Sequence, residues 1–376
     1  MATFDVCVVG LGGAGSQAAL HLARRGARVV GIDRYRPPHP LGSSHGRTRI
    51  IREAYFEEPL FVPLVRRSYE LWAELERESG RTLYRRTGGL MIGPPEGILV
   101  DGALASAREH ALEHELLDAA ETERRFPAFE LREDDVAVLE PRAGILRPEA
   151  AVDAALQLAA AAGAELRFDE PVLGWEPDGD GVAVRLDGET LRADRLVIAA
   201  GPWVSQLVPR LAASVELTRQ PVLWVAPAAR RESLLRPESF PIFLWEWRPG
   251  WMLYGFPDEG EGVKVAQHQH GEATTIDEVD RSVRDDDVAL VRDLVARLVP
   301  AANGELRDAS ICIYTNTPDE LFVVDSLPDA PQAVVVSACS GHGFKFVPAL
   351  GEAVAALVLG EQPAADLSPF ALARLG

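Results

Sequence analysis

Short apolar runs and amphipathic stretches alternate along the first part of the chain. Residues 5–10 are apolar, residues 16–26 carry apolar side chains at helical spacing, and residues 27–33 are apolar again. Apolar runs of this length next to glycines predict buried strands, and the order strand, helix, strand predicts a crossover unit of a parallel sheet. Helix followed by strand returns over residues 149–168.

The pattern changes over residues 217–270, where short apolar runs alternate with turns and include Trp224, Trp245, Trp247 and Trp251. Such a composition is typical of an antiparallel sheet. An amphipathic helix is predicted over residues 285–300. The chain then ends with an apolar strand, a glycine-rich turn and a helix, predicted over residues 333–339, 340–344 and 348–359. Together these elements predict an α/β (α+β) protein of two domains, one Rossmann-like and one built on an antiparallel sheet.

Composition narrows the classes of function. A chain of 376 residues is long enough for two domains. Its net charge of −19 argues against a nucleic acid or an anionic membrane surface as partner. Three cysteines, Cys7, Cys312 and Cys339, are too few for a disulfide framework and suit a reducing cytoplasm. We expect neither a signal peptide nor a transmembrane span, and therefore a cytoplasmic protein.

Lysine is unusually rare. Of 38 basic residues, all but Lys264 and Lys345 are arginines. Either the two lysines persist by chance, or each is needed as a compact ammonium group with an adjustable pKa.

The first strand is followed by "GLGGAG", which contains Gly10, Gly12 and Gly15. Glycines at this spacing permit a tight turn and bring a helix N-terminus close to a pyrophosphate. Asp33 ends the second strand at the distance expected for an acid that binds a ribose hydroxyl. The alternative is an ordinary strand–helix turn, but strand, helix and acid together predict dinucleotide binding. The motif does not choose between FAD and a nicotinamide cofactor.

A cationic segment follows in "GSSHGRTRIIREAY", residues 42–55. His45, Arg47, Arg49 and Arg52 fall within eight positions, interrupted by two isoleucines. A solvated charge run would lack the isoleucines, and buried arginines need an anion or an aromatic face. We therefore predict a binding site here rather than an exposed surface.

Five segments in this order resemble the family of monomeric sarcosine oxidase and N-methyltryptophan oxidase, flavoenzymes of the glycine/D-amino-acid oxidase superfamily. They are "GLGGAGSQAALHLARRG", "GSSHGRTRIIREAY", "YGFPDEGEGVKVAQHQ", "CIYTNTPDELFVVD" and "SGHGFKF". The resemblance covers essentially the whole chain. It implies a Rossmann-like FAD-binding domain over residues 1–84, 143–216 and 319–376, and a substrate domain over residues 85–142 and 217–318.

The resemblance also implies roles for single residues. Cys312 matches the cysteine that joins FAD covalently through its 8α-methyl group, although a buried cysteine between isoleucines is otherwise an inert packing residue. Cys7 and Cys339 are expected to be core residues. Lys264 matches the oxygen-activating lysine, and Arg52 and Lys345 match the pair that binds the substrate carboxylate. Both lysines thus fall on functional positions of the family.

Two further groups follow from the same resemblance. One lines the flavin or substrate cavity and comprises His45, Arg49, Tyr254 and His268. The other contacts the cofactor and comprises Ser43, Thr48, Gly341 and Gly343.

The sequence departs from the family pattern in two places. Ser44 and Arg47 stand where related sequences often have histidine and aspartate beside the flavin. Trp245 and Trp247 add bulk to a segment that borders the substrate pocket in this family.

The expected function is oxidation of the secondary amine of a small amino acid, with O₂ reduced to hydrogen peroxide. Sarcosine, another N-methyl amino acid or a cyclic imino acid would be the substrate, and the enzyme would be a monomer without a metal. Alternatives are an N-methyltryptophan-type oxidase with a larger substrate, and a flavin dehydrogenase that passes electrons to a carrier. A non-catalytic flavin- or nucleotide-binding protein is the third alternative.

Overall fold

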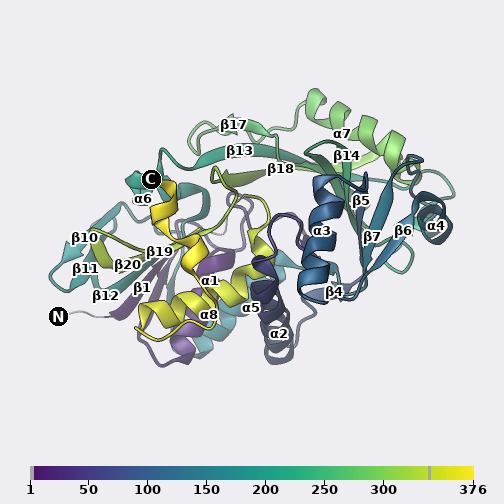
Figure 1. Cartoon of the computed structure of the whole chain (residues 1–376). Coiled ribbons are helices and arrows are strands. Elements are labelled where there is room, and N and C mark those ends of the chain that lie inside the picture. Colours follow the sequence, from purple (N-terminus) through teal and green to yellow (C-terminus); the bar gives the residue numbers. More distant parts are fainter. Residues whose placement is uncertain (1–3, 338–339) are drawn as a thin grey trace.

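The computed structural model describes residues 4–337 and 340–376 and contains two large sheets (Figure 1). Cys339, and with it the end of the strand predicted over 333–339, lies outside the described residues. In Figure 1 the sheet that contains β1 lies on one side and the strands β5–β7 on the other. The long strands β13 and β18 run across the top between them.

The first sheet has eight strands in the order β10-β11-β12-β1-β2-β9, and β20 pairs with both β12 and β19. Its strands are β1 (Phe4–Val9), β2 (Val29–Ile32), β9 (Glu165–Arg167), β10 (Gly174–Asp178), β11 (Gly181–Arg185), β12 (Thr190–Ile198), β19 (Val323–Leu327) and β20 (Ala330–Ser337). Strands β9, β2, β1, β12 and β20 are parallel, as the crossover pattern of the sequence predicts.

Helices cover one face of this sheet. The helix α1 (Gly13–Arg24) packs against both α5 (Pro148–Ala161) and α8 (Val347–Val358), and α2 (Phe61–Ser79) packs against α5 and α8. Alternation along β1 explains the two cores of the sheet, because Val6 and Val8 face the helices whereas Cys7 faces the opposite cluster. Cys7 is fully buried, and burial raises its pKa to about 12, so it is a core residue as predicted.

The second sheet has nine strands in the order β17-β13-β16-β15-β14-β5-β7-β6, with β18 paired to β13. Its strands are β5 (Gly89–Gly93), β6 (Glu115–Asp118), β7 (Val136–Glu140), β13 (Glu216–Val225), β14 (Ile242–Arg248), β15 (Trp251–Phe256), β16 (Val263–His268), β17 (Glu272–Thr274) and β18 (Leu306–Asn316). The strands predicted over 217–270 are antiparallel to their neighbours, except that β14 pairs in parallel with β5.

The two faces of this sheet have different partners. The helix α7 (Asp285–Leu298) shares a core with Val263 and Val265 of β16 and with Leu223 of β13. The residue between the two valines, Lys264, therefore points to the opposite face. Helix α3 (Ile98–Glu109) packs on β5, β7 and β14.

The remaining elements are small. A three-stranded sheet joins β3 (Arg49–Ile51), β8 (Gly144–Leu146) and β4 (Tyr84–Arg86), and the short helices are α4 (Ala119–Arg125) and α6 (Val204–Leu207). No helix among the described residues combines the length and the apolarity that a bilayer crossing requires. The α/β fold class with an additional antiparallel sheet is confirmed, whereas the domain boundaries stay a prediction.

The glycine turn after β1 generates a first prediction. A methyl group added at Gly15 would lie 1.7 Å from the carbonyl oxygen of Gly10. Gly15→Ala should therefore force α1 away from β1 and lower the free energy of unfolding by about 3 kcal/mol or more. Gly12→Ala is the matched control, because its methyl group would meet Ser44 Oγ at an ordinary 3.5 Å. Denaturant unfolding measures both variants, and equal stability of the two would contradict the packing argument.

Candidate active site

A cavity of about 370 Å³ lies at the glycine turn. Predicted residues in its wall are Gly10, Gly12, Asp33, Ser43, Arg49, Cys312, Gly341 and Gly343. Helix α1 begins at this wall with Gly12 as its N-cap, without a side-chain cap and without an acidic residue in its first turn. The positive dipole end of the helix therefore favours an anionic group in this cavity.

Asp33 lies in the same wall and is 7% exposed. Its Oδ2 accepts the N–H of Leu11 at 2.7 Å, and its Oδ1 accepts the N–H of Tyr35 at 3.0 Å. These bonds fix the carboxylate at the end of β2 and leave lone pairs for a ligand hydroxyl.

A second cavity, of about 70 Å³, adjoins the first. The two share five wall residues, namely Arg49, Cys312, Tyr314, Gly341 and Phe344. The smaller cavity adds the predicted residues Thr48, Arg52, Tyr254, Lys264, His268 and Lys345. Cys312 therefore lies where the dinucleotide-type cavity meets a small cavity rich in cations.

One face of the second sheet supplies much of the smaller cavity. Leu244, Tyr254, Lys264, His268, Cys312 and Tyr314 all line it and come from β14, β15, β16 and β18. Side chains alternate along strands, and residues paired across antiparallel strands share a face. The register pairs Leu244 with Tyr254 and Met252 with His268, so these side chains gather on one side. Trp245 points to the other side and donates Nε1–H to Asp135 at 3.1 Å. Neither Trp245 nor Trp247 lines the smaller cavity, so they do not narrow it.

The surroundings of Cys312 lower the pKa of its thiol and favour the thiolate. Burial alone would raise the pKa of its thiol, but a hydrogen bond from His45 and the charges of Arg49 and Lys264 lower that pKa to about 6. At neutral pH the thiolate therefore predominates, which is the nucleophilic form of cysteine. The Nε2 atom of His45 is buried and has no hydrogen-bond partner among the described residues.

Lys264 is 3% exposed and is surrounded by acceptors. Its Nζ donates to the carbonyl oxygens of Gly46 at 2.7 Å and Thr48 at 2.8 Å, and to Thr48 Oγ1 at 3.2 Å. An ammonium group has three N–H bonds, and here each has an acceptor. Burial and the nearby Arg49 hold the pKa of Lys264 well below its usual value.

Arg52 is buried and paired. Its guanidinium donates to both carboxylate oxygens of Glu57, at 2.6 and 2.8 Å, and to the carbonyl oxygen of Ala54 at 2.8 Å. Burial would raise the pKa of Glu57, but Arg52, His342 and Lys345 lower it to about 2. Both bonds to Glu57 come from Nη2, and Nη1 donates to Ala54, so a carboxylate of the chain itself already holds one side of the guanidinium.

Lys345 lies beside this pair. Its Nζ donates to the carbonyl oxygen of His342 at 3.0 Å, and burial together with Arg52 lowers its pKa to about 7. The ring of His342 joins Glu320 O through Nε2 at 2.9 Å and Tyr55 Oη through Nδ1. Because a carbonyl oxygen only accepts, Nε2 carries the proton and Tyr55 donates to Nδ1. Burial lowers the pKa of His342 to about 4, so its ring is neutral.

The predicted wall residues His268 and Tyr254 are also neutral at pH 7. Burial lowers the pKa of His268 to about 3 and raises that of Tyr254 to about 12. His268 Nδ1 lies 3.3 Å from Tyr314 Oη. The smaller cavity is thus lined by neutral aromatic groups as well as by cations.

Two predicted residues line neither cavity. Gly15 packs on the carbonyl oxygen of Gly10, and His45 hydrogen-bonds to Cys312 without lining either cavity. Sequence reasoning missed several wall residues, among them Glu57, Tyr314 and His342. Tyr314 and His342 lie inside motifs that the resemblance quotes, whereas Glu57 has no comparable signal in the sequence.

The two departures from the family pattern have local explanations. Ser44 Oγ accepts the N–H of Gly13 at 3.0 Å, and Ser44 lines the larger cavity. The Arg47 guanidinium is partly exposed and pairs with Asp308 and with Glu261. Arg47 lines neither cavity.

Comparison with known proteins reveals the class. The sequence model of the family described as FAD dependent oxidoreductase matches residues 5–357. A monomeric sarcosine oxidase from Streptomyces avermitilis is 46% identical over 99% of this chain and 98% of its own length. An N-methyl-L-tryptophan oxidase from Salmonella heidelberg is 35% identical over 99% of each chain. The solved structure of NikD, an unusual amino acid oxidase essential for nikkomycin biosynthesis, has a TM-score of 0.85 at 26% identity and covers 99% of this chain and 98% of its own.

The chain therefore belongs to the FAD-dependent oxidoreductases. Within that family it groups with the monomeric sarcosine oxidases and N-methyl-L-tryptophan oxidases, which makes it a flavin-dependent amine oxidase. The resemblance drawn from the sequence motifs is confirmed, and so is FAD as cofactor.

The larger cavity fits that cofactor. The start of α1, which has no acidic residue in its first turn, suits a pyrophosphate, and Asp33 is fixed where a ribose hydroxyl would be recognised. Only glycine fits at positions 10 and 15 of the turn, since a methyl group at either would collide with backbone atoms. Among the described residues, no group of three or more His, Cys, Asp or Glu side chains could hold a metal ion.

Proposed function

We propose that the protein oxidises the secondary amine of a small amino acid to an imine and that O₂ is reduced to hydrogen peroxide. The observation that carries this proposal is the position of Cys312, whose thiol lies in the wall shared by the FAD-type cavity and the cationic cavity. We further propose that Cys312 holds FAD through a thioether to its 8α-methyl carbon. This bond would replace the S–H of the thiol and one C–H of the methyl group, and the two electrons released would pass to O₂, the oxidant of the proposed reaction. The low pKa of the thiol, about 6, supports a nucleophilic role.

The chemistry that bound FAD supplies is removal of a hydride equivalent from the carbon beside the amine nitrogen and its transfer onward to O₂. The protein's part is to bind, orient and charge the site. Residues that line both cavities, Arg49 and Tyr314 among them, would face the cofactor and the substrate together.

Arg52 and Lys345 are proposed to bind the substrate carboxylate. Their proximity to the smaller cavity and their positive charge support this role. Because Glu57 already accepts from Nη2 of Arg52, a bound substrate would have to displace Glu57 or share this nitrogen with it. Arrival of a second carboxylate would also raise the pKa of Lys345 from about 7, so that the ammonium form prevails.

The amine must lose its proton before oxidation. Glu57 is the one carboxylate in the described wall of the smaller cavity, and its pKa of about 2 makes it a weak base. His268 and Tyr254 are neutral. The cations Arg49, Arg52 and Lys264 would instead lower the amine's own pKa by like-charge repulsion.

Lys264 is proposed to stabilise the negative charge that develops on oxygen. Its three acceptors in residues 46–48 favour the ammonium form against the burial that lowers its pKa, so it would supply a fixed positive charge. The longest of these bonds, to Thr48 Oγ1 at 3.2 Å, is the one that a water molecule or an oxygen species could most easily replace.

Cavity size favours a small substrate over the N-methyltryptophan alternative. A volume of about 70 Å³ has room for roughly five to seven water-sized groups. Sarcosine, with about six non-hydrogen atoms, fits that room, whereas N-methyltryptophan has about sixteen. We also propose a cytoplasmic enzyme, because the thiols of Cys7 and Cys312 are free, and a monomer, by similarity to the relative named monomeric sarcosine oxidase.

The proposal predicts a flavin that survives denaturation. The intact protein should exceed the mass of its polypeptide by one FAD, and Cys312→Ser should lose this excess because serine has no thiolate. Cys7→Ser is the matched control and should keep it. Mass spectrometry measures this directly, and FAD that leaves the denatured wild-type protein would refute the attachment.

Peroxide release with sarcosine, proline, pipecolate and N-methyltryptophan tests the reaction itself. Reduction of the flavin without peroxide would favour a dehydrogenase.

The carboxylate anchor predicts opposite effects of two substitutions. Arg52→Gln should raise KM, at a cost of about 2–5 kcal/mol in substrate binding, because it removes a buried partner of a carboxylate. Glu57→Gln should lower KM several-fold, since the substrate carboxylate no longer competes with Glu57 for the guanidinium. Steady-state kinetics with the free acid and its methyl ester checks both. An ester that reacts as well as the acid would contradict the assignment.

A further inference from the structure

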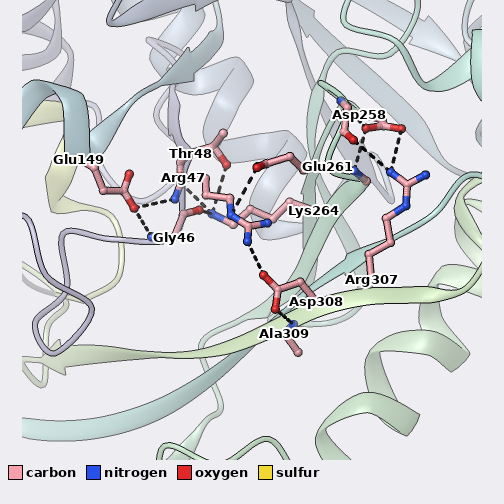
Figure 2. Close-up of polar contacts among 12 residues, drawn as sticks. Gly46, Arg47, Thr48, Glu149, Asp258, Glu261, Lys264, Arg307, Asp308 and Ala309 are labelled. Atoms are coloured by element: carbon pink, nitrogen blue, oxygen red, sulfur yellow. Dashed lines mark hydrogen bonds and ion pairs between the residues drawn. The ribbon is translucent and has the colours of Figure 1, made fainter.

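The surroundings of Lys264 on the sheet show how its ammonium is held (Figure 2). The register places Phe256 of β15 opposite Lys264 of β16, Lys264 opposite Trp224 of β13, and Trp224 opposite Asp308 of β18. Residues paired in this way share a face. The four side chains therefore form a row across four neighbouring strands, with Lys264 next to two aromatic rings and Asp308 at the outer end.

Residues 46–48 cross this row. The carbonyl oxygens of Gly46 and Thr48 accept bonds from Lys264, while the backbone N–H groups of Gly46 and Arg47 point the other way. Both of these N–H groups donate to Oε1 of Glu149, at 2.7 and 2.9 Å. Gly46 and Arg47 have φ values of 96° and 69°, a left-handed conformation that a non-glycine residue adopts only when its surroundings enforce it.

The side chain of Arg47 binds the same segment to the second sheet. Its guanidinium lies 4.3 Å from the centre of the Trp224 ring, and it pairs with Asp308 and, at 3.4 Å, with Glu261. Figure 2 shows Arg47 reaching toward both carboxylates, while Glu149 holds the backbone of the segment from the other side. Residues 46–48 are thus bound to α5 through Glu149 and to the sheet through the side chain of Arg47.

We propose that Glu149 and Arg47 are positioning residues that clamp residues 46–48 onto Lys264 and so fix its ammonium in the wall of the smaller cavity. The side chains of Glu149 and Arg47 make no hydrogen bond to Lys264 among those that hold its ammonium group. Each acts through the two carbonyl oxygens that receive the ammonium. The clamp itself rests on the geometry, and its importance for the oxygen step rests on the proposed function.

Neighbouring charges, including those of Arg47 and Glu149, also change the pKa of Lys264. Burial, Arg49 and Arg47 lower its pKa, whereas Cys312 and Glu149 raise it. Glu149→Gln keeps an acceptor oxygen for the two N–H groups and removes the charge. Glu149→Ala removes both, so the pair of variants separates the geometric part of the clamp from its electrostatic part.

The rarity of lysine makes the test direct. In the flavin-loaded enzyme labelled with ¹⁵N-lysine, only Lys264 and Lys345 give side-chain ammonium signals, and Lys345→Arg assigns them. We expect Glu149→Ala and Arg47→Gln each to speed the exchange of the Lys264 ammonium protons with water by roughly tenfold or more. Glu149→Gln should keep the exchange slow and lower the Lys264 pKa. Asp308→Asn, a milder change, should speed the exchange to a smaller extent.

Arg307→Gln is the matched control. Arg307 adjoins Asp308 in β18, is exposed to a similar degree as Arg47, and pairs with Asp258 and Gly260 instead of the clamp. Unchanged exchange in both Glu149→Ala and Arg47→Gln would overturn the proposal. So would equal acceleration in Arg307→Gln, because that would indicate a general loosening of the sheet.

Stopped-flow kinetics separates this inference from the proposed function. With the clamp loosened, reoxidation by O₂ should slow by roughly tenfold, because a displaced charge stabilises the oxygen step less well, while anaerobic reduction by substrate stays within about twofold. Faster proton exchange with an unchanged reoxidation rate would leave the clamp in place and refute the oxygen role of Lys264 instead.

Discussion

A buried ammonium group must be given acceptors or lose its charge, and this constraint organises the site around Lys264. Burial makes the charged form of this residue costly, as its lowered pKa indicates. Two backbone carbonyl oxygens and a hydroxyl compensate for the lost water. These acceptors exist only because residues 46–48 fold over the sheet, and that segment continues into β3, which carries Arg49 at its start. One segment, residues 43–52, therefore supplies the acceptors for Lys264 and contributes Ser43, Arg49 and Arg52 to the cavity walls.

The smaller cavity carries more positive than negative charge, and the fold tolerates this excess in two ways. Glu57 neutralises Arg52 through bonds from a single nitrogen, Nη2, and a substrate carboxylate could replace Glu57 with little change in net charge. Cys312 contributes a thiolate beside Arg49 and Lys264. A thioether at Cys312 would remove this negative charge, so the cationic character of the site would increase once flavin is attached.

Local sequence patterns were enough to predict part of this arrangement. The glycine turn, Asp33 and the cationic segment depend on neighbours within a few positions, so the sequence alone predicts them. The gathering of Tyr254, Lys264 and Cys312 on one sheet face depends on pairing between distant strands, which composition does not specify. Glu57 and Glu149 were missed because a carboxylate that caps a backbone segment or pairs with an arginine looks like any surface acid in the sequence. Strand alternation could have placed Trp245 away from the cavity, given that Leu244 faces it.

Lys264 is proposed to contribute a fixed charge to the oxygen step and little to amine oxidation. The decisive experiment is stopped-flow measurement of the two half-reactions in Lys264→Met and in Lys264→Arg, the variant that keeps a charge but spreads it over a larger group. We expect Lys264→Met to be reoxidised slower than the wild type by roughly a hundredfold or more, its anaerobic reduction to be affected far less, and Lys264→Arg to recover part of the loss. Wild-type reoxidation rates in both variants would refute the oxygen role and leave Lys264 as a structural residue.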